Sequence, residues 1–217
     1  MNKKNLFFFL FALTLILAIF LFVPTKSKKN KLENEPSHEI NYTLENYHSD
    51  FIQRQSDSVK GLIHQLEEKI TKANDSLVKV NALSEAINLY NQLQSPEISS
   101  LLVFKKAEII KNTNSWKVTG DNFIALLTDM KLDTNLIQDV VHHATLSYEN
   151  SIALDSNNVE AKLQLAQCYM EMSQQPMNGV QLLLGVVRKD STNTKAQLLL
   201  AKFGLVSGQY EKVLQRL

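Results

Sequence analysis

The chain has 217 residues, and its 23 Lys and Arg nearly balance its 22 Asp and Glu. The resulting net charge of +1 provides no long-range field that would attract nucleic acid or another polyanion. Cys168 is the single cysteine, which excludes an intramolecular disulfide and a metal site built from cysteines. Gly and Pro are few, and Leu, Lys, Gln, Glu and Ala are frequent in the second half, so an all-α fold is predicted.

Residues 1–24 have the pattern of an N-terminal membrane anchor. Leu6 to Val23 is a run of 18 residues in which Thr14 is the only polar side chain. As a helix, the run would reach about 27 Å, which is enough to span the hydrocarbon core of a bilayer. No small-residue cleavage site ends the run and no cysteine follows it, so we expect an uncleaved signal anchor rather than a cleaved signal peptide.

Residues 25–37 are mostly Lys, Asn, Glu, Ser and Pro, which predicts a polar linker. Lysines flank the apolar run on both sides, so the positive-inside rule barely separates the two orientations. A short tail before a first and only span usually stays in the cytoplasm. We therefore expect a single-pass membrane protein with an extracytoplasmic, periplasmic body, and a body on the cytoplasmic face is the alternative.

Residues 38–76 are predicted to form an amphipathic helical segment. Their apolar side chains recur at spacings of three and four residues: Ile40, Leu44, Tyr47, Phe51, Val59, Leu62, Leu66 and Ile70. Asp57, Ser58 and Gly61 interrupt this stripe, so the segment is one helix or two. The stripe either self-associates as a coiled coil or folds back onto the following helices, and fewer than three clean heptads favour the second outcome.

A sequence pattern that begins at Asp155 returns 35 residues later at Asp190. Both copies read Asp-Ser-x-Asn-x-x-Ala-x-Leu-x-Leu-Ala. Similarity at a fixed period is typical of repeat arrays. A unit of this length without cysteines or β-alternation is one pair of antiparallel helices, which buries its apolar stripe by stacking on the next pair.

Residues 77–217 contain further positions in this register, where large and small side chains alternate as close helix packing requires. One unit contains Trp116, Thr119, Gly120, Phe123, Ala144, Tyr148 and Ser151. The unit before it contains Leu83, Ala86, Ile87, Tyr90, Ser100, Phe104 and Ala107, with Ser95 and Pro96 at the turn between its helices.

These positions resemble the tetratricopeptide repeat (TPR) family, whose pattern places Trp, Leu, Gly and an aromatic residue in a first helix and Ala, an aromatic residue and Ala in a second. Trp116, Gly120 and Phe123 match, while Thr119 replaces the Leu. The next unit offers Leu165, Ala166 and Tyr169, then Gly179, Leu183 and Val186. Leu200, Ala201, Gly204, Gly208 and Tyr210 open another, in which Leu217 takes the place of the second-helix aromatic. The resemblance implies a TPR-like solenoid of antiparallel helix pairs with about three to four repeats. It also implies a TPR protein of the membrane-anchored bacterial type.

The chain also departs from the family pattern within one unit and at the turns between units. About a dozen extra residues separate Phe123 from Ala144, so either the helices are extended or residues 128–135 form a looped insertion. Ser156 and Ser191 stand where the family has Pro, which loosens each turn between repeats.

No cluster in the sequence has the composition of a catalytic site. Asp139 lies three and four residues before His142 and His143, so a carboxylate and an imidazole can share one helix face and hold a metal. No third partner is recognisable, so we expect no metal and no cofactor. The stretch from Gly204 to Gly208 lacks the spacing of a nucleophile elbow. The sequence therefore predicts a protein that is not an enzyme.

The resemblance implies a concave groove, lined by the first helices, that takes a peptide or a partner helix. The candidate groove residues are Asn114, Lys117, Asp121, Glu160, Gln164, Gln167, Lys195, Leu198, Leu199 and Lys202. Asp121 would repel a carboxylate, which argues against the carboxylate clamp of the family's chaperone-tail binders. We expect recognition by shape and a few hydrogen bonds.

Together these features predict a membrane-anchored adaptor or scaffold of the cell envelope. It would bind another protein, contact the bilayer through residues 6–23 and bind no nucleic acid. The alternative is a self-associating structural spacer of the envelope, a homo-oligomer held by residues 40–70.

Overall fold

The structure is a computed structural model that describes residues 42–128, 132–173 and 175–214. The described residues all belong to one compact unit, Ile40–Leu217. The predicted anchor (1–24) and linker (25–37) lie outside the described residues. Within the described ranges, no helix is both long enough and apolar enough to cross a membrane.

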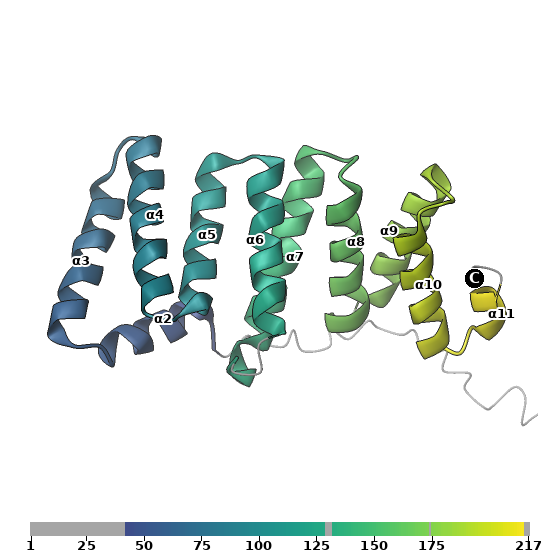
Figure 1. Ribbon diagram of the computed structural model, residues 1–217, viewed down its shortest axis with the longest axis horizontal. Helices are drawn as coiled ribbons and strands as arrows, with labels where there is room; N and C mark the ends of the chain where they lie inside the picture. Colours follow the sequence, from purple (N-terminus) through teal and green to yellow (C-terminus); the bar gives the residue numbers. More distant parts are fainter. Residues whose placement is uncertain (1–41, 129–131, 174, 215–217) are drawn as a thin grey trace, which may run out of the picture. The chain divides into compact units, whose positions relative to one another are not determined.

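The described residues form helices and no strand (Figure 1), which confirms the all-α prediction for this part of the chain. In chain order the elements are α2 (Leu44–Gln53), α3 (Asp57–Lys72), α4 (Ser76–Gln92), α5 (Pro96–Ile110), α6 (Thr113–Leu127), a 3-10 turn η1 (Thr134–Leu136), α7 (Ile137–Leu154), α8 (Val159–Gln167), a π-helical turn η2 (Cys168–Met172), α9 (Pro176–Lys189), α10 (Thr194–Val206) and α11 (Tyr210–Leu214). Consecutive helices from α3 to α11 contact one another.

The predicted amphipathic segment 38–76 contains two helices, α2 and α3. Thr43 and Ser56 cap their first turns by accepting backbone N–H bonds, so the break falls just before Ser56 and Gly61 lies inside α3. The apolar stripe packs inside the chain: Tyr47, Phe51, Val59, Leu66 and Ile70 all pack against the buried core of α3, α4 and α5. The stripe thus folds back onto the following helices.

The helix pairs of the predicted register are present as α4/α5, α6/α7, α8/α9 and α10/α11. The helices within a pair contact each other, and a turn or loop joins them, so they run antiparallel. Pro96 occupies the first turn of α5. Backbone N–H groups in a first turn have no acceptor within the helix, so the missing N–H of proline costs no hydrogen bond there. The described part of the chain therefore has the TPR-like arrangement of stacked helix pairs.

The repeated Asp-Ser-x-Asn sequence forms the turn between pairs. Asn158 and Asn193 cap α8 and α10 by accepting the N–H groups of Ala161 and Ala196. Asp155 ends α7, and its carboxylate accepts the N–H of Asn157 at 2.9 Å. Side-chain hydrogen bonds thus hold turns in which the family's Pro is missing.

Small residues lie where helices of a pair come closest. A Cβ added at Gly120 of α6 would lie 2.7 Å from the ring of Tyr148 on α7. A Cβ added at Gly179 of α9 would lie 2.5 Å from the carbonyl oxygen of Ala166 on α8. Both glycines are therefore required by the approach of a neighbouring helix.

The predicted insertion follows α6. That helix ends at Leu127, α7 begins at Ile137, and η1 lies between them, while residues 129–131 are outside the described ranges. The helix α7 is also long, with 18 residues against 14 in α9. The insertion therefore combines a loop with an extended second helix.

The expected first helix of the last unit is corrected in one respect. It ends at Val206, Gly208 takes a left-handed conformation (φ 73°) in the turn, and Tyr210 begins the second helix, α11. The flexible backbone of glycine allows this sharp reversal, which ends the helix before Gly208. Leu217 lies outside the described residues.

The apolar core follows the pairs along the chain. After the α3–α5 core, a central core joins α5, α6, α7 and α8, and a third joins α8, α9 and α10. The central core is built from Leu44, Leu101, Phe123, Leu126, Leu136, Val140, Ala144, Tyr148, Ala161, Leu165 and Cys168. Each pair thus buries its apolar residues against the next one, as a repeat array requires.

Candidate functional site

The residues predicted to line a groove all lie on the first helices of three pairs. Asn114, Lys117 and Asp121 are on α6, Glu160, Gln164 and Gln167 on α8, and Lys195, Leu198, Leu199 and Lys202 on α10. Leu198 is 61% exposed, whereas Leu199 packs against the core of α8, α9 and α10.

The charged members of this set on α6 are engaged within the protein. The Nζ of Lys117 lies 2.6 Å from one carboxylate oxygen of Asp121, one helical turn away. The other oxygen of Asp121 accepts the hydroxyl of buried Tyr148 at 2.8 Å. Burial and this acidic acceptor raise the pKa of Tyr148, so the phenol remains a neutral donor.

The charges on α8 and α10 pair across helices. The Nζ of Lys195 lies 3.3 Å from the carboxylate of Glu160, and that of Lys202 lies 2.6 Å from Glu171 in η2. Glu171 also accepts the side-chain amide of Gln167 at 3.1 Å. The sequence reasoning missed Glu171. Both lysines are thus already paired with carboxylates of their own chain in the unbound protein.

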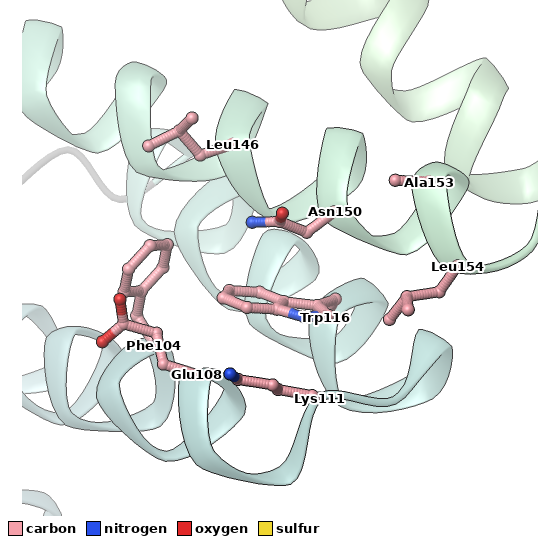
Figure 2. A pocket seen from close by; sticks show the side chains of 8 residues that line it. All are labelled: Phe104, Glu108, Lys111, Trp116, Leu146, Asn150, Ala153 and Leu154. Atoms are coloured by element: carbon pink, nitrogen blue, oxygen red, sulfur yellow. The ribbon is translucent and has the colours of Figure 1, made fainter.

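A second candidate surface is a groove of about 700 Å³ at the junction of α5, α6 and α7 (Figure 2). It is lined by Phe104, Glu108, Lys111, Trp116, Leu146, Asn150, Ala153 and Leu154. Figure 2 shows Trp116 between the side chains contributed by α7 and those contributed by α5 and its C-terminal end. The rings of Phe104 and Trp116 meet edge to face with centroids 5.3 Å apart, which fixes the indole in place.

The polar groups of the α5–α7 groove are unpaired within the described chain. The side chains of Glu108, Lys111 and Asn150 make no hydrogen bond or ion pair to any described residue, and the indole N–H of Trp116 donates to none. Donors, acceptors and an aromatic surface therefore converge on one open groove. Such a combination can bind a peptide by a few hydrogen bonds and apolar contacts.

Sequence reasoning overlooked this groove, although α7 contains a signal for it. Leu146, Asn150, Ala153 and Leu154 recur at helical spacing on a stripe separate from Ala144, Tyr148 and Ser151, which face the core. Leu154 is 52% exposed. An apolar stripe beyond the one used for the core is a feature typical of a binding surface.

Asp139 and His143, weighed above as metal ligands, form part of a structural cluster. Asp139 is buried and accepts the N–H of Leu44 at 2.7 Å, which holds the first turn of α2. The Nδ1 of His143 lies 3.3 Å from the same carboxylate. The described residues contain no group of three or more His, Cys, Asp or Glu placed to hold a metal ion.

The Asp139–His143 pair perturbs both pKa values. Burial by itself raises the pKa of Asp139, but the hydrogen bonds from His143 and Leu44 outweigh it and lower that pKa. Burial by itself lowers the pKa of His143, but the carboxylate outweighs it and raises that pKa. The pair is therefore most favourable when the carboxylate is ionised and the imidazole is protonated.

Cys168 lies fully buried at the start of η2, in the central core. Burial raises the pKa of its thiol to about 12, so the thiolate is scarce at neutral pH. The thiol thus packs as a small apolar side chain.

Comparison with known proteins gives a likeness in structure but none in sequence. No protein-family model matches the chain, and no curated protein is similar to it in sequence. The solved structure described as "Crystal structure of MamA" is similar over 73% of this chain and 84% of that one, with 12% sequence identity and a TM-score of 0.48.

Proposed function

We propose that this protein is a membrane-anchored adaptor whose stacked helix pairs bind another protein or a peptide, without covalent chemistry. The observation that carries the proposal is the α5–α7 groove, where Trp116, Asn150, Glu108 and Lys111 present unpaired polar groups beside apolar side chains. Glu108 and Lys111 are exposed and Asn150 is half-buried, so a bound partner can reach these side chains and form hydrogen bonds with them.

The anchor and the side of the membrane are part of the same proposal. The run from Leu6 to Val23 supports a single span with the helix pairs on the periplasmic side. Retention in the membrane pellet after alkaline extraction, lost on deletion of residues 6–23, tests the anchor. Protease accessibility in spheroplasts tests the orientation: a helix-pair domain digested only after lysis would place it in the cytoplasm.

The proposed groove can be tested by site-specific photo-cross-linking in native membranes. A photoreactive residue is placed at Leu154 in the α5–α7 groove, at Leu198 on the predicted first-helix surface, and at Gln65, an exposed control on α3. We expect a discrete product from Leu154, identifiable by mass spectrometry and weakened by Asn150→Leu. A product from Leu198 alone would move recognition to the first helices. Products no stronger than those from Gln65 at both positions would contradict the adaptor function.

The alternative of a self-associating spacer has less support. The described apolar residues of 40–70 that would meet in a coiled coil pack into the protein's own cores, and of these residues Leu62 remains well exposed. A single exposed leucine does not form the repeated seam that a coiled coil needs.

A further inference from the structure

The chain contains a second groove, of about 460 Å³, between α8 and α9. It is lined by Lys162, Leu165, Tyr169, Asn178, Gln181, Leu182, Gly185 and Lys189. In the repeat register, Lys162 corresponds to Trp116, Gly185 to Asn150 and Lys189 to Leu154. The α8/α9 groove is therefore the equivalent of the α5–α7 groove one repeat later, with a different chemistry.

Gly185 leaves the α8/α9 groove open. Glycine destabilises the interior of a helix relative to alanine, so a helical glycine needs a reason. Close packing supplies it for Gly120 and Gly179, but a Cβ at Gly185 would meet no atom within 4 Å. Gly61 is equally unhindered, yet it is exposed on α3 and lines neither groove. Gly185 differs from Gly61 because it lines a groove. Its missing side chain allows a bound ligand to come close to the backbone of α9.

The two lysines of this groove meet at one turn. The Nζ of Lys162 donates to the carbonyl oxygen of Ser156, and that of Lys189 donates to the side-chain oxygen of Asn157 at 3.3 Å. Among the described residues neither lysine forms an ion pair, whereas Lys195 and Lys202 on α10 each do. No carboxylate lines the groove, and the hydrogen-bond acceptors of both lysines are neutral.

The floor between these charges is apolar. Leu165 is 4% exposed and belongs to the central core, and Leu182 packs against both that core and the core of α8, α9 and α10. The hydroxyl of Tyr169 donates to Glu149 on α7, which holds its ring at one end of the groove. The groove thus has a rigid apolar floor with positive charge above it.

We propose that the α8/α9 groove binds an acidic amphipathic segment of a partner protein. An apolar side chain of that segment lies on Leu165 and Leu182 and passes over Gly185, and a neighbouring carboxylate is held between Lys162 and Lys189. Charge-assisted hydrogen bonds to two lysines make such a carboxylate the best-matched anion, and the apolar floor selects for a hydrophobic neighbour. This inference rests on the proposed function and names the chemistry of the partner.

The test is a selection of random displayed peptides on the full-length protein in nanodiscs of zwitterionic lipid. We expect the enriched peptides to share an Asp or Glu adjacent to a large apolar residue. One enriched peptide, labelled with a fluorophore, is then titrated against variants of the protein. Gly185→Leu fills the groove, and Lys162→Gln with Lys189→Gln removes its charge. Each should weaken binding by about tenfold or more, because a charge-assisted hydrogen bond is worth roughly that factor.

The matched control is Lys195→Gln with Lys202→Gln, which removes the same charge from α10. Its affinity for the peptide should equal that of the wild type. Folding of Gly185→Leu is checked by circular dichroism, and the open space at this position predicts an unchanged spectrum. Enriched peptides without acidic residues, no enrichment at all, or equal binding by Gly185→Leu would each overturn the inference.

Two further outcomes separate this inference from its premises. If Leu154 still cross-links but Gly185→Leu does not change peptide binding, the α8/α9 groove is not the peptide site. The adaptor function would remain supported in that case. A wild-type dimer in light scattering that becomes monomeric in Gly185→Leu would assign the groove to a second copy of the chain, which also overturns the inference.

Discussion

Alanine substitutions at two glycines of α9, Gly179 and Gly185, should change stability in opposite directions. Each substitution adds one methyl group to the same helix. At Gly185 that group meets no atom within 4 Å. Alanine is preferred to glycine in a helix and also restricts the unfolded chain, so Gly185→Ala should stabilise by about 0.5 to 1 kcal/mol.

At Gly179 the same methyl group collides with its surroundings. Its Cβ would lie 2.5 Å from the carbonyl oxygen of Ala166 and 2.6 Å from the Cγ of Met170. Met170 is a flexible side chain that can move, but the carbonyl belongs to the backbone of α8 and moves only if α8 and α9 separate. Overpacking of this kind costs about 1 to 3 kcal/mol. After the gain in helix propensity, Gly179→Ala should destabilise by about 1 to 2 kcal/mol.

Thermal unfolding of the full chain in detergent micelles, followed by far-ultraviolet circular dichroism, measures both changes. For a domain of this size about 1 kcal/mol moves Tm by about 2 to 4 °C, so the two variants should lie on either side of the wild type. Gly120→Ala, whose Cβ meets the ring of Tyr148 at 2.7 Å, should behave like Gly179→Ala. Changes of the same sign at Gly179 and Gly185 would refute the assigned packing of α8 against α9.

Three other measurements address the core. Asp139→Asn should lower the free energy of unfolding by about 1 kcal/mol near pH 6. Because the pKa of Asp139 is lowered, its contribution is present above about pH 4 and is lost as pH falls through its folded pKa. The contribution of His143, whose pKa is raised, is present below about pH 6.5 and lost as pH rises through its folded pKa. If Tm of Asp139→Asn depended on pH as Tm of the wild type does, the pH dependence assigned to Asp139 and to His143 would both be contradicted. Ala201→Leu, at a buried position of α10, should overpack and destabilise by about 1 to 3 kcal/mol, and an unchanged Tm would contradict the register. Cys168 should resist alkylation at pH 8 until denaturant unfolds the chain, and rapid native labelling would contradict its burial.

The helix pairs could be predicted from the sequence because their signals are local. Asn158 and Asn193 cap helices through bonds that reach only three residues ahead. Gly120 and Tyr148 belong to one pair, so their contact follows from the repeat pattern itself. Alternation of large and small residues therefore fixes the register before any coordinates are known.

The binding surfaces could not be predicted in the same way. Lys195 was expected to face a ligand, but its Nζ lies beside Glu160, 35 residues earlier, and Lys202 pairs with Glu171, which the pattern does not mark. Whether a surface lysine has a carboxylate partner depends on how one pair stacks on the next. The repeat pattern, which describes each pair separately, does not contain this information.

The sequence by itself determined the all-α class, the helix pairs and their register, because capping, turn residues and helical periodicity act over a few residues. Only the tertiary structure decided that α2 is held by the carboxylate of Asp139, 95 residues away. It also decided that Lys195 and Lys202 pair with carboxylates on other helices, while Lys162 and Lys189 form no ion pair with any described residue. Such pairing depends on distances between side chains on different helices, which are set only when the pairs pack together.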